Sequence, residues 1–323
     1  MIGRRAALGA AAATAFVEWR ARAQEAGRVY RIGHFGVTER SEQLTRDRIV
    51  PELETLGFVL GRNLVIEGRH GSAAELPRLA REILLGRPDV IVAIGAQALR
   101  AMSDTTTSVP IVMFADDPVA MGVAASLARP GGNVTGVANM VVDLQAKRLD
   151  LLREALPSIT RVGALLKAIS PTRAKLEAEL AASAARAGLA LTIAYADDAG
   201  DFPAAFEVLR AAGVQATVIG PDPQFYAAVD RLVALAGAAR LALSCEWPDM
   251  ARAGCLIGYG TDQLAMRARL AQYVARILRG ANAGDLPIEQ PTVFELVLNL
   301  RTARSLGVAV PPALLARADE VIE

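Results

Sequence analysis

Short apolar runs alternate with amphipathic segments along almost the whole chain, and this alternation limits the possible folds more than any other feature. Segments such as Glu75–Leu85 carry apolar residues at helical spacing, whereas the runs between them have the length of buried strands. The first set of runs is Val29–Phe35, Leu64–Glu67, Val90–Ile94, Ile111–Ala115 and Val134–Ala138. The second set is Val162–Leu166, Leu191–Tyr195, Ala216–Ile219, Leu241–Ser244 and Cys255–Gly258. Near-continuous apolar strands predict parallel sheets with helices on both faces.

The two sets of strands match in spacing. Gly95 and Gly220 end the third strand of each set and lie 125 residues apart, and Ala115 and Cys245 end the fourth at a separation of 130. The chain of 323 residues also has the length of two ordinary domains. The sequence therefore predicts an α/β protein of two similar, Rossmann-like lobes, each built on a parallel five-stranded sheet.

The residues after the second set are too few for a third domain. We expect this segment to pack back across the two lobes, with a long helix, one more strand and a final helix that begins at a Pro-Pro pair. The expected boundaries are 24–138 plus part of 261–323 for lobe one, 139–260 for lobe two, Gln263–Leu278 and Phe294–Leu298 for the helix and strand, and Pro311 to about Ile322 for the final helix.

The N-terminus differs from the rest of the chain. Arg4 and Arg5 precede the uncharged run Ala6–Val17, and Ala21-Arg22-Ala23 has the small-x-small pattern of a signal-peptidase site. Residues 1–23 are therefore predicted to be a signal peptide that directs the chain to the periplasm by the Sec or the twin-arginine route. The alternative is a solvated helix of a cytosolic protein. No other stretch has the apolar length of a membrane span, so we do not expect a membrane-embedded protein.

Composition and missing motifs exclude several functions. The charges nearly cancel, with 35 Lys and Arg against 34 Asp and Glu, which argues against nucleic-acid binding. The chain has neither a dinucleotide or phosphate-binding glycine motif nor a nucleophile elbow, and two histidines and two cysteines are too few for a typical zinc site. We expect no cofactor and no metal. Cys245 and Cys255 could pair in an oxidising periplasm, but we favour two buried thiols because they belong to separate strands.

The predicted architecture also gives candidate ligand-binding residues. Ligands of open α/β sheets bind outside the carboxyl ends of the strands, and two facing lobes bring those ends to one cleft. The residues at these ends are His34, Phe35, Gly36, Gly95, Ala96, Gln97, Asp116, Asp117, Asn139, Ser170, Pro171, Thr172, Asp222, Glu246, Trp247 and Tyr259.

Some of these candidates fit a definite chemistry. The free backbone N–H groups where Gly95–Gln97 opens a helix favour a carboxylate or phosphate. Ser170-Pro171-Thr172 has the cap and first-turn proline of another helix start. Asp116 and Asp117 could accept hydrogen bonds from an ammonium or hydroxyl group, and Trp247 and Tyr259 could cover a flat ligand.

A structural role is the alternative for several of them. Asp followed by Pro commonly opens a turn, so Asp116 and Asp117 could serve only as a cap. His34 could simply bond to the backbone, and Trp247 could belong to the core. These alternatives stay open at the level of the sequence.

Several segments together resemble one protein family. They are Asp117-Pro118, Ser126–Gly136, Lys147–Leu152, Tyr259-Gly260, Leu286–Thr292, Phe294–Val297 and Pro311–Ile322. With them, the whole chain resembles the periplasmic substrate-binding components of ABC transporters, specifically the uncharacterised or tryptophan/tyrosine-type family. Lys167–Pro171 and Asp116 depart from the family pattern and leave the ligand's identity open.

The resemblance implies a type I periplasmic-binding-protein fold that closes on a small ligand and delivers it to a permease driven by a separate ATPase. The implied ligand is an amino acid, with aromatic ones among the candidates, or a small organic acid. The implied protein is a monomer and not an enzyme. The competing hypotheses are a two-lobed α/β enzyme acting on a small metabolite and a ligand sensor for a membrane receptor.

Overall fold

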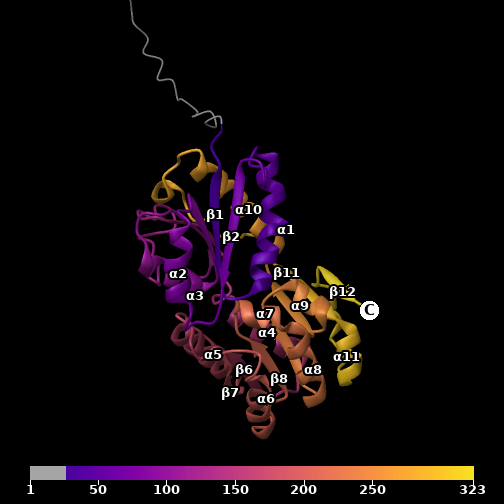
Figure 1. Ribbon diagram of the computed structural model, residues 1–323. Helices are drawn as coiled ribbons and strands as arrows, with labels where there is room; N and C mark the ends of the chain where they lie inside the picture. The colour runs from indigo at the N-terminus through magenta and orange to yellow at the C-terminus, as the bar shows by residue number, and fades with distance from the viewer. Residues whose placement is uncertain (1–26) are drawn as a thin grey trace, which may run out of the picture.

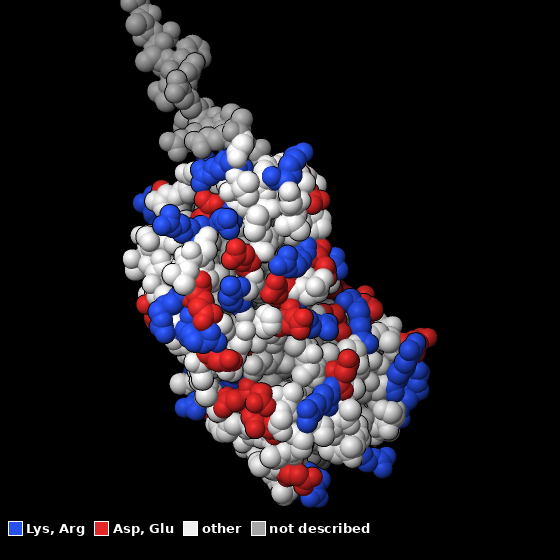
Figure 2. Space-filling view, viewed as in Figure 1, with Lys and Arg blue, Asp and Glu red and all other residues white. Residues whose placement is uncertain are grey.

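The structure is a computed structural model that describes residues 27–323; the predicted signal peptide, residues 1–23, lies outside the described residues. The described chain forms two lobes, one above the other in Figure 1, each with helices packed around a sheet. Acidic and basic side chains are interspersed over the face in Figure 2, as the nearly balanced charge leads us to expect. No helix within residues 27–323 is both long and apolar enough to cross a membrane.

Lobe one is built on a parallel five-stranded sheet with the strand order β2-β1-β3-β4-β5. Its strands are β1 (Tyr30–Gly36), β2 (Leu64–His70), β3 (Val90–Ile94), β4 (Ile111–Ala115) and β5 (Val134–Ala138). Its helices are α1 (Glu39–Thr55), α2 (Leu76–Leu85) and α3 (Ala96–Thr105). The three central strands β1, β3 and β4 are buried almost throughout, which explains their continuous apolar sequence.

Lobe two repeats the same strand order and extends it. Its sheet has the order β12-β11-β10-β9-β8-β6-β7, and β11 runs antiparallel to β10. The strands are β6 (Arg161–Leu166), β7 (Ala190–Tyr195), β8 (Ala216–Ile219), β9 (Ala242–Cys245), β10 (Ile257–Gly260), β11 (Glu295–Asn299) and β12 (Glu320–Ile322). The helices are α4 (Gln145–Ala155), α5 (Arg173–Ala187), α6 (Phe202–Ala211), α7 (Pro223–Ala227), α8 (Val229–Ala239) and α9 (Pro248–Ala253). The predicted α/β fold with two parallel sheets is confirmed.

The C-terminal segment is shared between the lobes. α10 (Gln263–Leu278) returns to lobe one and packs on α1 and on β3, β4 and β5, followed by the 3-10 turn η1 (Ala283–Asp285). β11, α11 (Leu300–Leu306), α12 (Pro312–Leu315) and β12 then complete lobe two. The lobe boundaries predicted from the sequence stay a proposal, which this strand pairing supports.

The predicted final helix is wrong in its extent. α12 ends at Leu315, and Glu320–Ile322 forms a strand parallel to β11 instead. The backbone of Asp319 begins this pairing by donating to the Leu296 carbonyl over 2.9 Å, and its carboxylate accepts from the Leu296 amide over 2.7 Å. The backbone groups of the chain end thus form hydrogen bonds with the open edge of β11, whereas the last carbonyl groups of a solvated helix would have no partner within that helix.

A buried arginine ties the lobe connections together. Arg148 of α4 has no exposed surface and donates three hydrogen bonds to backbone carbonyls, to Val141 over 2.7 Å, Tyr259 over 2.8 Å and Glu246 over 3.3 Å. Val141 lies in the first connection between the lobes, and Tyr259 just precedes the second. Burial lowers the pKa of Arg148 to about 10, so it remains charged at neutral pH.

The two cysteines form a disulfide, which corrects our preference for free thiols. Cys245 ends β9, and Cys255 stands just before β10, with a Cα–Cα separation of 6.5 Å. β9 and β10 are adjacent and parallel, and only the short helix α9 separates them in sequence. Belonging to different strands therefore does not keep these cysteines apart. The disulfide closes the segment that carries Glu246, Trp247 and α9.

Candidate ligand-binding site

A cleft lies between the lobes at the carboxyl ends of their strands. Its empty volume is about 670 Å³, counting the open mouth. The predicted residues that line it are Gly95, Ala96, Gln97, Asp116, Asn139, Ser170, Thr172, Asp222, Glu246 and Trp247. Both lobes therefore contribute to the site, and a ligand bound there would contact both.

The residues predicted at the end of β1 are not among those that line this cleft. The side chain of His34 is fully buried within lobe one, and Phe35 belongs to the apolar core between the sheet and α2 and α3. Gly36 lies where an added Cβ would be 3.1 Å from His34 Nε2 and 3.3 Å from Ser41 Oγ. The strand continues past the predicted end, so that Val37 is the residue of this segment that reaches the cleft.

Three further predicted residues are also outside the cleft lining. The carboxylate of Asp117 accepts from the Ala120 amide over 3.0 Å and so caps a turn. Pro171 is exposed at the surface. The Tyr259 ring packs against Phe294 with a centroid separation of 6.3 Å rather than facing the cleft.

Residues that the sequence did not single out complete the lining. They are Val37, Ile94, Phe114, Ala115, Val141, Val142, Pro221, Tyr226, Gln263 and Arg267, and Pro223, next to the predicted Asp222, lines the cleft as well. Ile94 and Phe114 lie inside apolar runs and looked like ordinary core residues. Gln263 and Arg267 are four residues apart at the start of α10, a spacing that puts them on one helix face. This spacing was the only feature of the sequence that could have indicated that the two residues face the same space.

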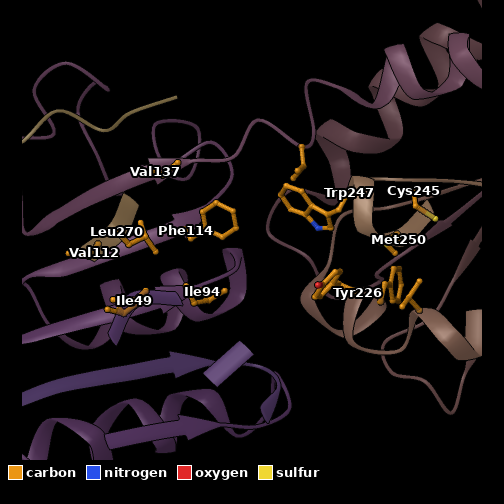
Figure 3. Packing of buried hydrophobic residues seen from close by; sticks show 14 of the residues in the cluster. Ile49, Ile94, Val112, Phe114, Val137, Tyr226, Cys245, Trp247, Met250 and Leu270 are labelled. Carbon is orange, nitrogen blue, oxygen red and sulfur yellow. The ribbon is translucent and has the colours of Figure 1, made fainter. Parts of the chain in front are cut away.

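Two aromatic rings from opposite lobes meet in the cleft. Phe114 projects from β4 and Trp247 from the loop after β9, and Figure 3 shows them facing one another between the lobes. Their centroids are 6.0 Å apart and their planes differ by 25°. Tyr226, from α7, lies beside them in the same view. These rings give the cleft an apolar face suited to a flat or hydrophobic group.

Asp116 places one carboxylate in this largely enclosed space. Its side chain is 5% exposed, and Oδ2 accepts a hydrogen bond from the Val142 amide over 3.2 Å. Burial, reinforced by the nearby charge of Asp143, raises the pKa of Asp116 to about 6. The group is thus ionised at neutral pH at a cost in free energy, and a cation would lower that cost.

The other cleft carboxylates already have partners. Asp222 lies 3.7 Å from the ammonium of Lys167 and accepts from the Gln224 amide over 2.8 Å. Glu246 accepts hydrogen bonds from the Trp247 indole and the Asp222 amide, and complete burial raises its pKa well above the usual range. These contacts hold the loop that carries Trp247 in place.

The first turn of α3 offers backbone donors at the cleft, as predicted. Gly95 caps this helix with a φ of 92°, a conformation that glycine adopts without strain. A Cβ at Gly95 would lie 2.9 Å from Cγ of Pro223 in the other lobe. The second predicted helix start is displaced along the chain. The Ser170 hydroxyl accepts from the Thr172 amide over 3.3 Å, but α5 begins only at Arg173, with Thr172 at the N-cap position.

Polar contacts hold the lobes together around the cleft. The Lys175 ammonium of α5 donates to Asp117 of lobe one over 2.7 Å and to Asp143 over 2.9 Å. The Gln97 amide donates to the Ile169 carbonyl. The Arg40 guanidinium of α1 lies 4.8 Å from the ring centroid of Tyr226. The structure is therefore a closed form.

Across residues 27–323, no cluster of three or more His, Cys, Asp or Glu side chains could hold a metal ion.

Known proteins share both the sequence pattern and the fold. A tyrosine-binding protein of Clostridioides difficile (strain R20291) is 22% identical over 290 residues, which cover 84% of this chain and 80% of that protein. A conserved domain protein from Vibrio cholerae is 26% identical, with a TM-score of 0.83 over 91% of this chain and 100% of that one. A Streptococcus pneumonia ABC domain in complex with L-Trp is 21% identical, with a TM-score of 0.81 over the same shares.

A family model covers nearly all the described residues. The model for ABC transporter substrate binding proteins matches residues 37–322, which include every strand after β1 and every residue that lines the cleft. This match confirms the resemblance found in the sequence and a binding function in place of an enzymatic one. The chain belongs to the ABC transporter substrate binding protein family.

Proposed function

We propose that the chain is the extracytoplasmic binding component of an ABC importer and captures an amino acid with an aromatic side chain. The observation that carries the proposal is the pairing, in one interlobe cleft, of the Phe114–Trp247 aromatic face with the buried carboxylate of Asp116. An aromatic amino acid has the matching groups, a flat apolar ring and an ammonium. The tyrosine and tryptophan named for the two relatives support the same class of ligand.

Closure of the lobes would supply the capture step. A ligand that touches Phe114 and Asp116 in lobe one and Trp247 in lobe two gains its full set of contacts only when the lobes are closed. Because it binds the closed form better, it shifts the population toward that form. The closed protein would then dock on a membrane permease, which the family implies as the partner, and release the ligand for transport.

The location of the protein follows from the same proposal. The predicted signal peptide in residues 1–23 would send the chain to the periplasm, where the binding components of importers capture their ligands. The Cys245–Cys255 disulfide supports an oxidising compartment of this kind. Fractionation of cells that express the full chain, followed by N-terminal sequencing of the product, tests both the destination and the cleavage site.

The ligand class is tested by binding to the mature protein after unfolding and refolding to remove any bound ligand. Thermal shift and calorimetry would compare L-tryptophan, L-tyrosine and L-phenylalanine with L-leucine, L-glutamate and small organic acids. We expect the aromatic amino acids to bind most tightly. Saturation at 100 times the dissociation constant stabilises the protein by about 2.7 kcal/mol and raises its Tm measurably.

A matched pair of variants connects the binding to the cleft. Trp247→Leu removes a cleft ring, whereas Tyr195→Leu removes an exposed ring outside the cleft lining, whose hydroxyl donates to Glu177. Trp247→Leu should weaken binding of the aromatic ligand, and Tyr195→Leu should leave it unchanged. Preferential binding of aliphatic or acidic ligands, or equal binding by both variants and the wild type, would refute the proposed ligand class.

A further inference from the structure

A buried cation in the cleft lacks a partner in the protein. Arg267, one turn into α10, is 3% exposed and lines the cleft, yet its Nε and Nη1 atoms have no hydrogen-bond partner. Among residues 27–323, no carboxylate lies within 4 Å of its guanidinium to form an ion pair with it. The group rests over the Phe114 ring, 5.4 Å from the centroid. Burial of a charge without a partner is costly, so this position calls for an anion.

The surroundings of Arg267 do not supply that anion. Asp249 is the carboxylate whose charge acts on it. Its Oδ2 accepts from the Tyr226 hydroxyl at 2.5 Å and the Gln263 amide at 3.4 Å, and its Oδ1 has no hydrogen-bond partner and forms no bond to Arg267. Arg40 adds a second positive charge on the same side. The nearby His34 has both ring nitrogens without partners, and burial together with Arg267 lowers its pKa to about 3, so it is neutral.

The carboxylates of the cleft are committed elsewhere. Asp222 pairs with Lys167, and Glu246 accepts from the Trp247 indole. Asp116 bonds to the Val142 amide, and the lysine that influences it is Lys175, not Arg267. The charge that Arg267 lacks must therefore come from a molecule that enters the cleft.

We propose that Arg267 is the receptor for a carboxylate of the ligand, so that only molecules with a free carboxylate bind tightly. The proposal rests on the proposed function and deepens it, because it fixes the class of ligand by a second charged group. Because the Arg267 guanidinium carbon is 5.4 Å from the centroid of Phe114, a carboxylate bound to Arg267 would lie next to the Phe114–Trp247 aromatic face. Decarboxylated amines and carboxamides of the same ring system are then rejected, because they leave the buried guanidinium unpaired.

The first test needs no variant. Calorimetry would compare L-tryptophan with tryptamine and with L-tryptophanamide, and L-tyrosine with tyramine, on the refolded wild-type protein. We expect the amines and the amide to bind ten to a hundred times more weakly than the parent amino acids. An amine that binds as tightly as its amino acid overturns the proposal, even though the aromatic-ligand function would stand.

The second test uses variants on one helix. Arg267→Met removes the charge but keeps much of the apolar volume, Arg267→Lys keeps the charge, and Arg269→Met alters an exposed arginine paired with Glu289. We expect Arg267→Met to bind L-tryptophan ten to a hundred times more weakly and to lose the preference over tryptamine. Arg267→Lys should recover part of that preference, and Arg269→Met should behave as the wild type does.

The stability of the variants separates this role from a structural one. Since the cation is unpaired without ligand, ligand-free Arg267→Met should unfold at the same temperature as the wild type or higher. A fall in Tm together with an unchanged preference for carboxylates would assign Arg267 to the fold and overturn the proposal.

The proposal and the proposed function can fail separately. Suppose that aromatic amino acids do not bind, that another molecule with a free carboxylate does bind, and that Arg267→Met no longer binds that molecule. The role of Arg267 then stands, and the aromatic ligand class is refuted. If the wild type binds no carboxylate among amino acids and small organic acids, both are overturned.

Discussion

Replacement of Asp116 by asparagine should stabilise the empty protein while it damages the binding site. The pKa of Asp116 rises from its ordinary value of 3.8 to about 6, because of burial first and the charge of Asp143 second. The native state then holds more protons than the unfolded state between about pH 4 and pH 6. The stability contributed by this group is full below pH 4 and is lost as the pH rises through 6.

The magnitude follows from the size of the pKa shift. About two pKa units at 1.36 kcal/mol each give a cost of about 3 kcal/mol for the ionised carboxylate at pH 7. Asparagine carries no charge and can still accept from the Val142 amide. Ligand-free Asp116→Asn should therefore be more stable than the wild type by up to about 3 kcal/mol at pH 7 and by almost nothing at pH 4.

Binding should change in the opposite direction. An ammonium beside Asp116 favours its ionised form, so the wild type should release protons on binding near pH 6 and bind more weakly as the pH falls from 7 to 5. Asp116→Asn should show neither effect and should bind an amino acid at least about tenfold more weakly, since a charge-assisted hydrogen bond is lost.

The assay combines urea unfolding from pH 4 to 8 with calorimetry in two buffers of different ionisation enthalpy. Asp104→Asn is the control, because Asp104 is exposed and pairs with Arg100 on the same helix. The reasoning is refuted if Asp116→Asn gains no stability at pH 7, if the gain does not change with pH, or if its ligand affinity equals that of the wild type.

Three further predictions concern closure of the lobes, the disulfide and the lysine that bridges the lobes. Gly95→Ala should disfavour closure, since a Cβ would lie 2.9 Å from Pro223. With ligand present, small-angle scattering should show a larger radius of gyration than for the wild type, and calorimetry should show at least about tenfold weaker binding. Joint replacement of Cys245 and Cys255 by alanine should cost about 3 kcal/mol in urea unfolding, as expected for a loop of this length. Lys175→Met should weaken binding a few-fold and reduce its salt dependence, because this half-exposed lysine bridges the lobes.

Each of these three predictions has a control or a contrary outcome. Gly122→Ala is matched to Gly95→Ala, because Gly122 has a φ of 69° but nothing within 4 Å of its missing Cβ. Equal scattering profiles for the two variants would contradict the steric argument. An unfolding midpoint that stays the same without the cysteines, or an affinity that does not respond to Lys175→Met, would show that those links do not contribute as described.

The alternation of apolar and amphipathic segments was sufficient to predict the fold and much of the cleft. A run such as Val90–Ile94 is buried by its own sheet and helices, so its pattern records the strand and where it ends. Parallel strands place their carboxyl ends at one edge, which is why Gly95, Asp116 and Glu246 come together as expected. These conclusions depend on local patterns and on one general rule of topology.

Other features depended on contacts between distant segments. Pairing of the chain end with β11 replaced the last part of a predicted helix, and the adjacency of β9 and β10 joined Cys245 to Cys255. Burial looks alike in a sequence whether a side chain faces the core of one lobe, as His34 does, or the other lobe, as Phe114 does.

The sequence by itself determined the two-lobed α/β fold and the edge of each sheet where a ligand would bind, because strand periodicity and strand ends are local properties. Only the tertiary structure decided which side chains face that space, including Tyr226 and the unpaired Arg267. Whether a buried charge has a partner depends on the closure of one lobe on the other and on the return of α10 to lobe one, and no local pattern records either.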